Sequence, residues 1–125
     1  MNEDVPLIRL GDTLLVTLQG DLDDAAALRI EERVTREAAR MGAKGTLIDV
    51  SGLPVVDSFI ARELARVAAM LKLLGSEAVI VGLQPAVAIT LVELGVPMRR
   101  LQTALNAEQG MARLRRLRVD GTGTG

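Results

Sequence analysis

The first strand-like stretches of the chain lie near its N-terminus. Residues 6–10 and 13–18 are rich in apolar side chains, and in the second stretch every second residue from Leu14 onward is apolar. Such alternation is typical of a strand with one buried face. A Gly-Asp pair at positions 11–12 separates the two stretches and favours a tight turn. The pattern therefore predicts a β-hairpin.

Two long segments have apolar residues at the three- and four-residue spacing of amphipathic helices. The first begins at an N-cap supplied by Asp23 or Asp24 and ends at Gly42, and the second covers residues 58–74. Both segments are long enough to cross a sheet. The residues on their predicted inner faces are Ala27, Ile30, Val34, Ala38 and Met41 in the first, and Ile60, Leu64, Val67, Leu71 and Leu74 in the second.

Short apolar runs between the helices predict buried strands. Residues 46–50 and 78–81 are nearly continuous apolar segments rich in β-branched side chains, as in the central strands of a parallel sheet. A weaker strand is predicted near residues 101–102. A third helix starts at Pro85, and a last helix starts at Asn106 and carries Met111, Leu114 and Leu117.

The order of these elements predicts one α/β domain. Strands that alternate with helices imply right-handed crossovers and a mostly parallel sheet, with the N-terminal hairpin as its antiparallel part. The chain has 125 residues, 49% of them apolar, which suits a single core. We expect the domain to cover residues 1–118 and residues 119–125 to form a flexible tail without core residues.

Composition removes most classes of enzyme. The chain has no cysteine and no histidine, which excludes disulfides, thiol chemistry, most zinc sites and histidine-based catalysis. One phenylalanine is the only aromatic residue, so base-stacking surfaces are excluded, and a net charge of -1 gives no reason to expect nucleic acid. The acidic N-terminus and interrupted apolar runs predict neither a signal peptide nor a membrane span. We therefore expect a cytoplasmic protein without cofactor or metal.

The segment Asp49–Ala61 carries the clearest candidate site. It leaves a predicted buried strand, crosses a loop that contains glycine and proline, and enters the second helix. Sites in open α/β sheets gather beyond the carboxyl ends of the strands. Helix N-termini also present unpaired N–H groups that favour negative charge. Asp57 and Ser58 therefore lie where binding or modification is expected.

Residue chemistry leaves two interpretations of Asp57 and Ser58 open, and on its own it favours the first. In the first, one of them caps the helix and contributes about 1 kcal/mol. In the second, Ser58 accepts a phosphoryl group, which adds about -1.5 to -2 charges and would disrupt a hydrophobic interface. The apolar residues around this position are Val55, Val56, Phe59 and Ile60.

Other polar groups are weaker candidates. The aspartates between positions 21 and 24 lack the loop and closing glutamate of a calcium site, so a solvated, helix-capping turn is favoured. The arginines between positions 113 and 118 are expected to be solvated. Ser51 has no histidine or lysine base in sequence reach, and no phosphate-binding glycine loop occurs. None of these groups predicts an enzyme.

Several motifs together resemble the STAS domain family of anti-sigma factor antagonists and their relatives. The motifs are Gln19–Asp24, Leu47–Val50, Asp57–Ala61 and Gly82–Gly95, the last containing the block Gln-Pro-Ala-Val-Ala. The resemblance runs from about residue 7 to residue 117. Within the family, the chain is similar to the single-domain stressosome scaffold proteins.

This resemblance implies a specific role. It implies a dimer and a large hetero-oligomer with RsbR-type STAS proteins, which sequesters an RsbT-type serine kinase. The kinase would phosphorylate Ser58 and be released, and a phosphatase would reset the serine. Kinase or partner contact is expected at Asp57, Phe59 and Ile60. The protein itself would not be an enzyme.

Two alternatives remain open at this point. One is a simpler antagonist that binds an anti-sigma factor one-to-one and is regulated by serine phosphorylation. The other is an enzyme or ligand-binding domain that uses the loop before Ser58. The missing bases, metal ligands and phosphate-loop glycines argue against the second alternative.

Overall fold

The computed structural model of the protein describes residues 5–95 and 101–123. In this part of the chain five strands form one sheet, and four helices accompany it, in the order ββαβαβαβα that the sequence predicts. The elements are β1 (Leu7–Leu10), β2 (Thr13–Gln19), α1 (Asp24–Met41), β3 (Gly45–Gly52), α2 (Ser58–Leu73), β4 (Glu77–Val81), α3 (Pro85–Glu93), β5 (Gln102–Ala104) and α4 (Ala107–Gly123).

The sheet is mixed, as predicted. Strand β1 pairs antiparallel with β2, and Leu10 stands opposite Thr13 across the turn, where Gly11 has a φ of 63°. The remaining neighbours are parallel, and the spatial order β1-β2-β3-β4-β5 is the order along the chain. Strand β3 is therefore central, which accounts for the nearly continuous apolar run that predicted it.

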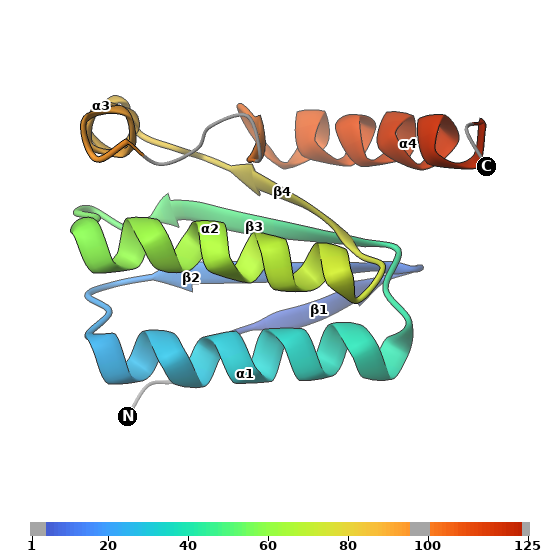
Figure 1. Ribbon diagram of the computed structural model, residues 1–125, viewed down its shortest axis with the longest axis horizontal. Coiled ribbons are helices and arrows are strands. Elements are labelled where there is room, and N and C mark those ends of the chain that lie inside the picture. The colour runs from blue at the N-terminus through green and yellow to red at the C-terminus, as the bar shows by residue number, and fades with distance from the viewer. Residues whose placement is uncertain (1–4, 96–100, 124–125) are drawn as a thin grey trace.

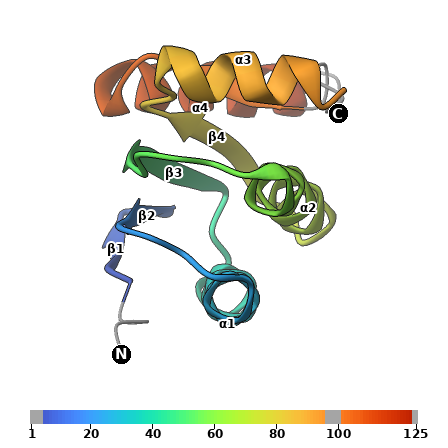
Figure 2. The ribbon, with the colours of Figure 1, turned by 90° about the vertical axis from the view of Figure 1, so that its left-hand side faces the viewer.

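Helices α1 and α2 lie side by side on one face of the sheet, and Figure 2 shows both on the same side of the strands. The main core lies between these helices and the sheet. Strand residues Leu14, Val16 and Ile48 meet Val34 of α1 and Leu64 of α2 there, all of them buried. The alternation in β2 and the helical spacing in α1 and α2 thus have one common cause, the burial of a single face of each element.

Helix α4 covers the opposite face. Leu114 packs in a second, smaller core with Leu47 of β3 and with Val79 and Val81 of β4. Because successive strand residues point to opposite faces, β3 and β4 contribute to both cores. This explains why these two strands are apolar along almost their whole length.

The structure differs from the sequence predictions in three places. Leu74, expected on the inner face of α2, is 48% exposed because it follows the last helical residue and its backbone leaves the helical conformation. The last strand begins one residue later than expected, at Gln102. Helix α4 continues to Gly123, so most of the predicted tail is helical, since each added residue of a formed helix gains one hydrogen bond.

Candidate functional site at the start of helix α2

The candidate site lies beyond the carboxyl end of β3, where a short loop leads into α2. Figure 1 shows α1 and α2 starting at the same end of the sheet, near the arrowheads of β2 and β3. Within the loop, Leu53 and Val56 are buried while Pro54 and Val55 are exposed. The loop is therefore fixed to the core at two points and exposes the residues between and after them.

Asp57 is the N-cap of α2. Its backbone is extended, with φ -83° and ψ -179°, and its Oδ1 accepts a hydrogen bond of 2.9 Å from the N–H of Ile60. Ser58 is the first residue inside the helix. Of the two capping residues that the sequence left open, the structure selects Asp57, and the hydroxyl of Ser58 is not needed to begin the helix.

Ser58 is exposed to solvent beside an apolar side chain. Val55 is 76% exposed and Phe59 is half-buried, whereas Val56 and Ile60 are 4% and 5% exposed and belong to the main core. The apolar cluster expected around Ser58 is thus divided between the surface and the interior. Because Ile60 faces the core, it does not offer its side chain to a partner as the sequence analysis expected, and Val55 provides the exposed apolar surface.

The start of α2 can accommodate an added negative charge. The first N–H groups of an α-helix have no intrahelical acceptor, and the helix dipole is positive at this end. Asp57 already accepts the N–H of Ile60, which leaves the N–H groups at the very start of the helix to a group on Ser58. The position therefore suits a phosphoserine without rearrangement of the helix.

A second group of polar residues holds the adjacent end of β3. Asp49 Oδ1 accepts hydrogen bonds from the N–H of Ser51 at 2.9 Å and from its hydroxyl at 2.7 Å. Gln84, the N-cap residue of α3, donates from Nε2 to the carbonyl oxygen of Ser51 at 3.1 Å. These bonds connect the ends of β3 and β4 and steady the loop that leads to Ser58. Nothing in the sequence alone assigns this role to Gln84, although the Gln-Pro pair at positions 84–85 marks the start of the helix.

Among the weaker candidates, Asp23 and Arg113 have structural roles in the described residues. Asp23 caps α1 by accepting the N–H of Ala26 at 2.7 Å, and no group of side chains suited to a metal ion occurs in residues 5–95 and 101–123. Arg113 donates to Gln102 Oε1 at 3.2 Å, while Arg115 and Arg116 are exposed. The side chain of Arg118 lies outside the described residues.

None of the helices in the described part of the chain combines the length and the apolar character needed to cross a membrane.

Comparisons with known proteins agree with the fold. A family model described as the STAS domain matches residues 5–105. The RsbT co-antagonist protein RsbRA of Bacillus subtilis (strain 168) is 29% identical over 107 residues, which are 85% of this chain and 39% of that protein. This chain therefore spans about two fifths of the length of the curated relatives that it matches.

Two solved structures are similar over nearly the whole chain. A serine-to-glutamate variant of RsbS from Moorella thermoacetica has a TM-score of 0.82 and 36% identity, and the match covers 91% of this chain and 97% of that chain. A chain from a structure described as the molecular architecture of the stressosome, a signal integration and transduction hub, has a TM-score of 0.79 and 37% identity. That match covers 90% of this chain and 97% of the other.

Proposed function

Because this chain belongs to the STAS domain family, we propose that it is a non-enzymatic scaffold protein of a bacterial stressosome. In this role it assembles with RsbR-type STAS proteins and retains an RsbT-type serine kinase in the cytoplasm. Phosphorylation of Ser58 releases the kinase, and a phosphatase restores the serine. The similarity to RsbS over 97% of that chain and to the RsbR-type co-antagonists supports this assignment.

The observation that carries the proposal is the placement of Ser58. Its side chain is exposed at the first turn of α2, while the neighbouring Asp57 performs the capping. A kinase can therefore reach the hydroxyl without unfolding the helix. Because Asp57 caps α2, a phosphoryl group on Ser58 would not remove the capping hydrogen bond of this helix.

Phosphorylation at this position would act on the surface and leave the fold intact. It adds about -1.5 to -2 charges three residues after Val55, which is 76% exposed, and immediately before the half-buried Phe59. A kinase surface that covers these apolar groups would have to desolvate the phosphate as well, at a large cost in free energy. Phosphorylation of Ser58 would therefore weaken the contact with the kinase that carries it out. This is the behaviour required for release of the kinase.

The site assignment is tested by incubating the protein with an RsbT-type kinase and ATP. Ser58→Ala is expected to abolish phosphoryl incorporation. Ser51→Ala is the matched control because Ser51 is also exposed and lies at the carboxyl end of β3, just before the same loop, but its hydroxyl is bonded to Asp49. The control is expected to be phosphorylated as the unchanged protein is. Equal incorporation into the Ser58→Ala variant would overturn the assignment.

The scaffold role is tested by size-exclusion chromatography with an RsbR-type partner. A stressosome scaffold is expected to form a megadalton species with that partner. A simple antagonist of an anti-sigma factor would instead form only a one-to-one complex with its target. If no large species forms, the scaffold proposal fails, even if Ser58 is phosphorylated.

A further inference from the structure

Glu63 of α2 is a buried acidic residue that the proposed function does not use. Only 8% of its surface is exposed, and its Oε2 atom has no hydrogen-bond partner. The residue lies on the inner face of α2 between Ile60 and Val67. A carboxylate in such a place loses its hydration without full replacement, which is costly for the charged form.

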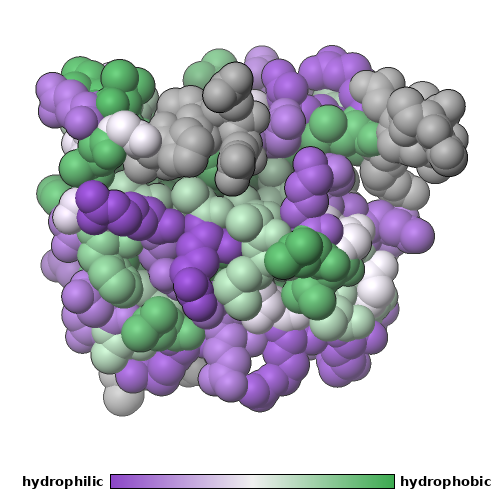
Figure 3. Space-filling model, viewed as in Figure 1, coloured by the Kyte–Doolittle hydropathy of each residue, from purple (hydrophilic) through white to green (hydrophobic). Residues whose placement is uncertain are grey.

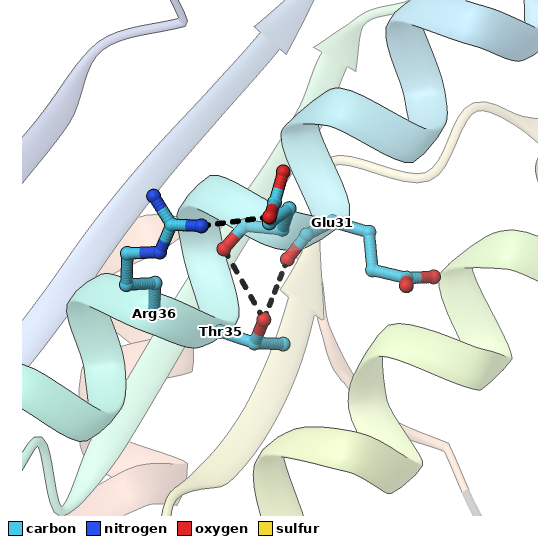
Figure 4. A network of polar contacts seen from close by, with 4 residues as sticks. Glu31, Thr35 and Arg36 are labelled. Carbon is cyan, nitrogen blue, oxygen red and sulfur yellow. Dashed lines mark hydrogen bonds and ion pairs between the residues drawn. The ribbon is translucent and has the colours of Figure 1, made fainter.

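A second carboxyl group faces Glu63 from the neighbouring helix. Glu31 points from α1 toward α2, as Figure 4 shows, and it lines the same cavity as Glu63. Its Oε1 also accepts a bond of 2.9 Å from Nε of Arg66, which is one turn further along α2. The side chain of Glu31 is 13% exposed and that of Arg66 is 63% exposed, so the arginine approaches the pair from the solvent side.

The two carboxyl groups border a small cavity of about 30 Å³ between α1, α2 and the sheet, a volume that suits water rather than a larger ligand. The other lining residues, which include Ile30 and Val34 of α1 and Ile60 and Val67 of α2, are all apolar. In the described part of the chain, the charged groups that act on Glu63 are thus Glu31 and Arg66. The single positive charge of Arg66 cannot neutralise two carboxylates. One proton shared by the two carboxyl groups would bring the net charge of the three side chains to zero.

We propose that Glu31 and Glu63 form a proton-sensitive latch between α1 and α2, which holds α2 most firmly when the two carboxyl groups share a proton. A hydrogen bond between the two acids can form only in that state, because two carboxylates offer no donor. Loss of the proton leaves two negative charges facing each other at the edge of an apolar cavity. The latch does not require phosphorylation to form, since neither of its carboxyl groups belongs to the proposed phosphorylation site.

The electrostatics of the pair agree with this arrangement. Burial, together with the hydrogen bond and the charge of Glu31, raises the pKa of Glu63 from 4.5 to about 7. The bond from Glu63, aided by Arg66, holds the pKa of Glu31 below its ordinary value. Glu63 thus binds its proton more tightly in the folded protein. Its contribution to stability is full below pH 4.5 and is lost as the pH rises to about 7.

The latch is connected to the start of α2 through Ile60. Ile60 lines the same cavity as Glu63, and its N–H is the donor that Asp57 accepts. A looser contact between the helices near Glu63 would therefore also loosen the packing of Ile60 in the first turn of α2. If the proposed function of Ser58 holds, the proton state of the pair tunes how firmly the phosphorylated turn is held.

The latch is tested by urea unfolding of the full chain between pH 5 and pH 8. We expect the folding equilibrium constant of the unchanged protein to fall by about tenfold to a hundredfold over this range owing to Glu63. Glu63→Gln keeps the shape and hydrogen-bonding capacity without a titrating group, and is expected to remove most of the fall. Glu32→Gln is the matched control, since Glu32 lies next to Glu31 but its side chain is 67% exposed, and it is expected to keep the fall.

Two measurements on the unchanged protein keep the test decisive if a variant folds poorly. Carbon NMR of the glutamate carboxyl groups is expected to show Glu63 titrating well above 4.5. Hydrogen exchange of α2, corrected for its intrinsic pH dependence, is expected to show greater protection at pH 6 than at pH 8. Titration of Glu63 near 4.5, or parallel stability curves for the unchanged protein and Glu63→Gln, would overturn the latch. None of these measurements depends on a kinase. A failure of the latch can therefore be distinguished from a failure of the proposed function.

Discussion

Helices α1 and α2 begin in the same way at the same end of the sheet (Figure 1). Asp23 and Asp57 are the N-caps, with φ values of -85° and -83° and ψ values of 171° and -179°. Each accepts a hydrogen bond from the N–H three residues later, at 2.7 Å for Asp23 and at 2.9 Å for Asp57. The backbone thus provides two equivalent helix starts, and only their side chains distinguish them.

The residue after the cap makes the first difference. In α1 it is the acidic residue Asp24, and in α2 it is Ser58. The first helix therefore shows that this geometry tolerates a carboxylate directly after a capping aspartate. A phosphoryl group on Ser58 would place charge at the equivalent point of α2. The comparison indicates that such a charge is compatible with the helix. Its effect would therefore fall on a partner that covers the start of α2.

The surroundings make the second difference. Beside Ser58, the surface carries the exposed Val55 and the half-buried Phe59, and Figure 3 shows the helix face of the molecule as a mixture of polar and apolar side chains. At the start of α1, the residue two before the helix is the half-buried Leu22, and the following positions Asp23, Asp24 and Ala25 are exposed. Of these two helix starts, that of α2 alone combines a modifiable residue with a strongly exposed apolar residue nearby in the sequence.

The largest expected effect is on affinity for the kinase, when the first residue of α2 is made acidic like the first residue of α1. Ser58→Asp is expected to weaken retention of an RsbT-type kinase by at least about tenfold, or about 1.4 kcal/mol, because a carboxylate then lies in the apolar contact. Circular dichroism is expected to show an intact helix. An unchanged affinity in a binding titration would mean that the kinase docks elsewhere on the molecule.

Removal of either cap tests whether the two starts are equivalent. Asp57→Ala and Asp23→Ala are each expected to lower the free energy of unfolding by about 1 kcal/mol, since each leaves one N–H without its acceptor. Urea unfolding of the two variants measures this directly. A loss confined to Asp23→Ala would show that Asp57 does not act as the cap of α2.

The role of the exposed apolar residue is tested by Val55→Ser. Because Val55 is 76% exposed, we expect stability to change by less than about 0.5 kcal/mol, while affinity for the kinase falls about threefold. Leu28→Ser is the matched control, an exposed apolar residue on α1 that is expected to leave the affinity unchanged. Equal effects of the two changes would point to nonspecific hydrophobic contact.

The smallest expected effect is the exchange of charge at the first helical position. Ser58→Asp is expected to stabilise the isolated protein by about 0.3 kcal/mol, and Asp24→Ser to destabilise it by a similar amount, through interaction with the helix dipole. Both changes should shrink in 1 M salt because exposed charges are screened. Effects of opposite sign would show that repulsion between adjacent residues exceeds the dipole interaction.

Most of the fold could be predicted because its signals are local. The hairpin turn before Thr13, the end of α1 at Gly42 and the buried run of β3 each depend on a few neighbouring residues. Strand β5 was placed less well, since its three residues are all half-buried and show no alternation. A short edge strand acquires its position from pairing with β4, which no local pattern contains.

The sequence predicted that Asp57 and Ser58 lie at the start of a helix, and the structure shows this, but the sequence did not assign their structural roles. Asp57 and Ser58 are both good capping residues by chemistry, and only the extended backbone at Asp57 decides between them. The burial of Ile60 and the exposure of Val55 likewise follow from the path of the loop. Phosphorylation and kinase contact at this site remain predictions.

The buried pair was missed although a signal was present. Glu63 lies three residues after Ile60 and four before Val67, so it falls on the apolar face of its helix, and Glu31 falls in the same way between Ala27 and Val34. An acidic residue on a core-facing stripe can be noticed in a sequence. That the two face each other depends on how α1 packs on α2, which is a property of the assembled layers.

The agreement between strand order and chain order has a consequence for how the protein is made. Each parallel strand pairs with the strand that precedes it along the chain. The connections between paired strands are therefore short in sequence, and the contact order is low for a parallel sheet. No strand has to wait for a segment that is synthesised much later. The sheet can therefore grow from β1 toward β5 as the chain leaves the ribosome, exposing one unfinished edge at a time.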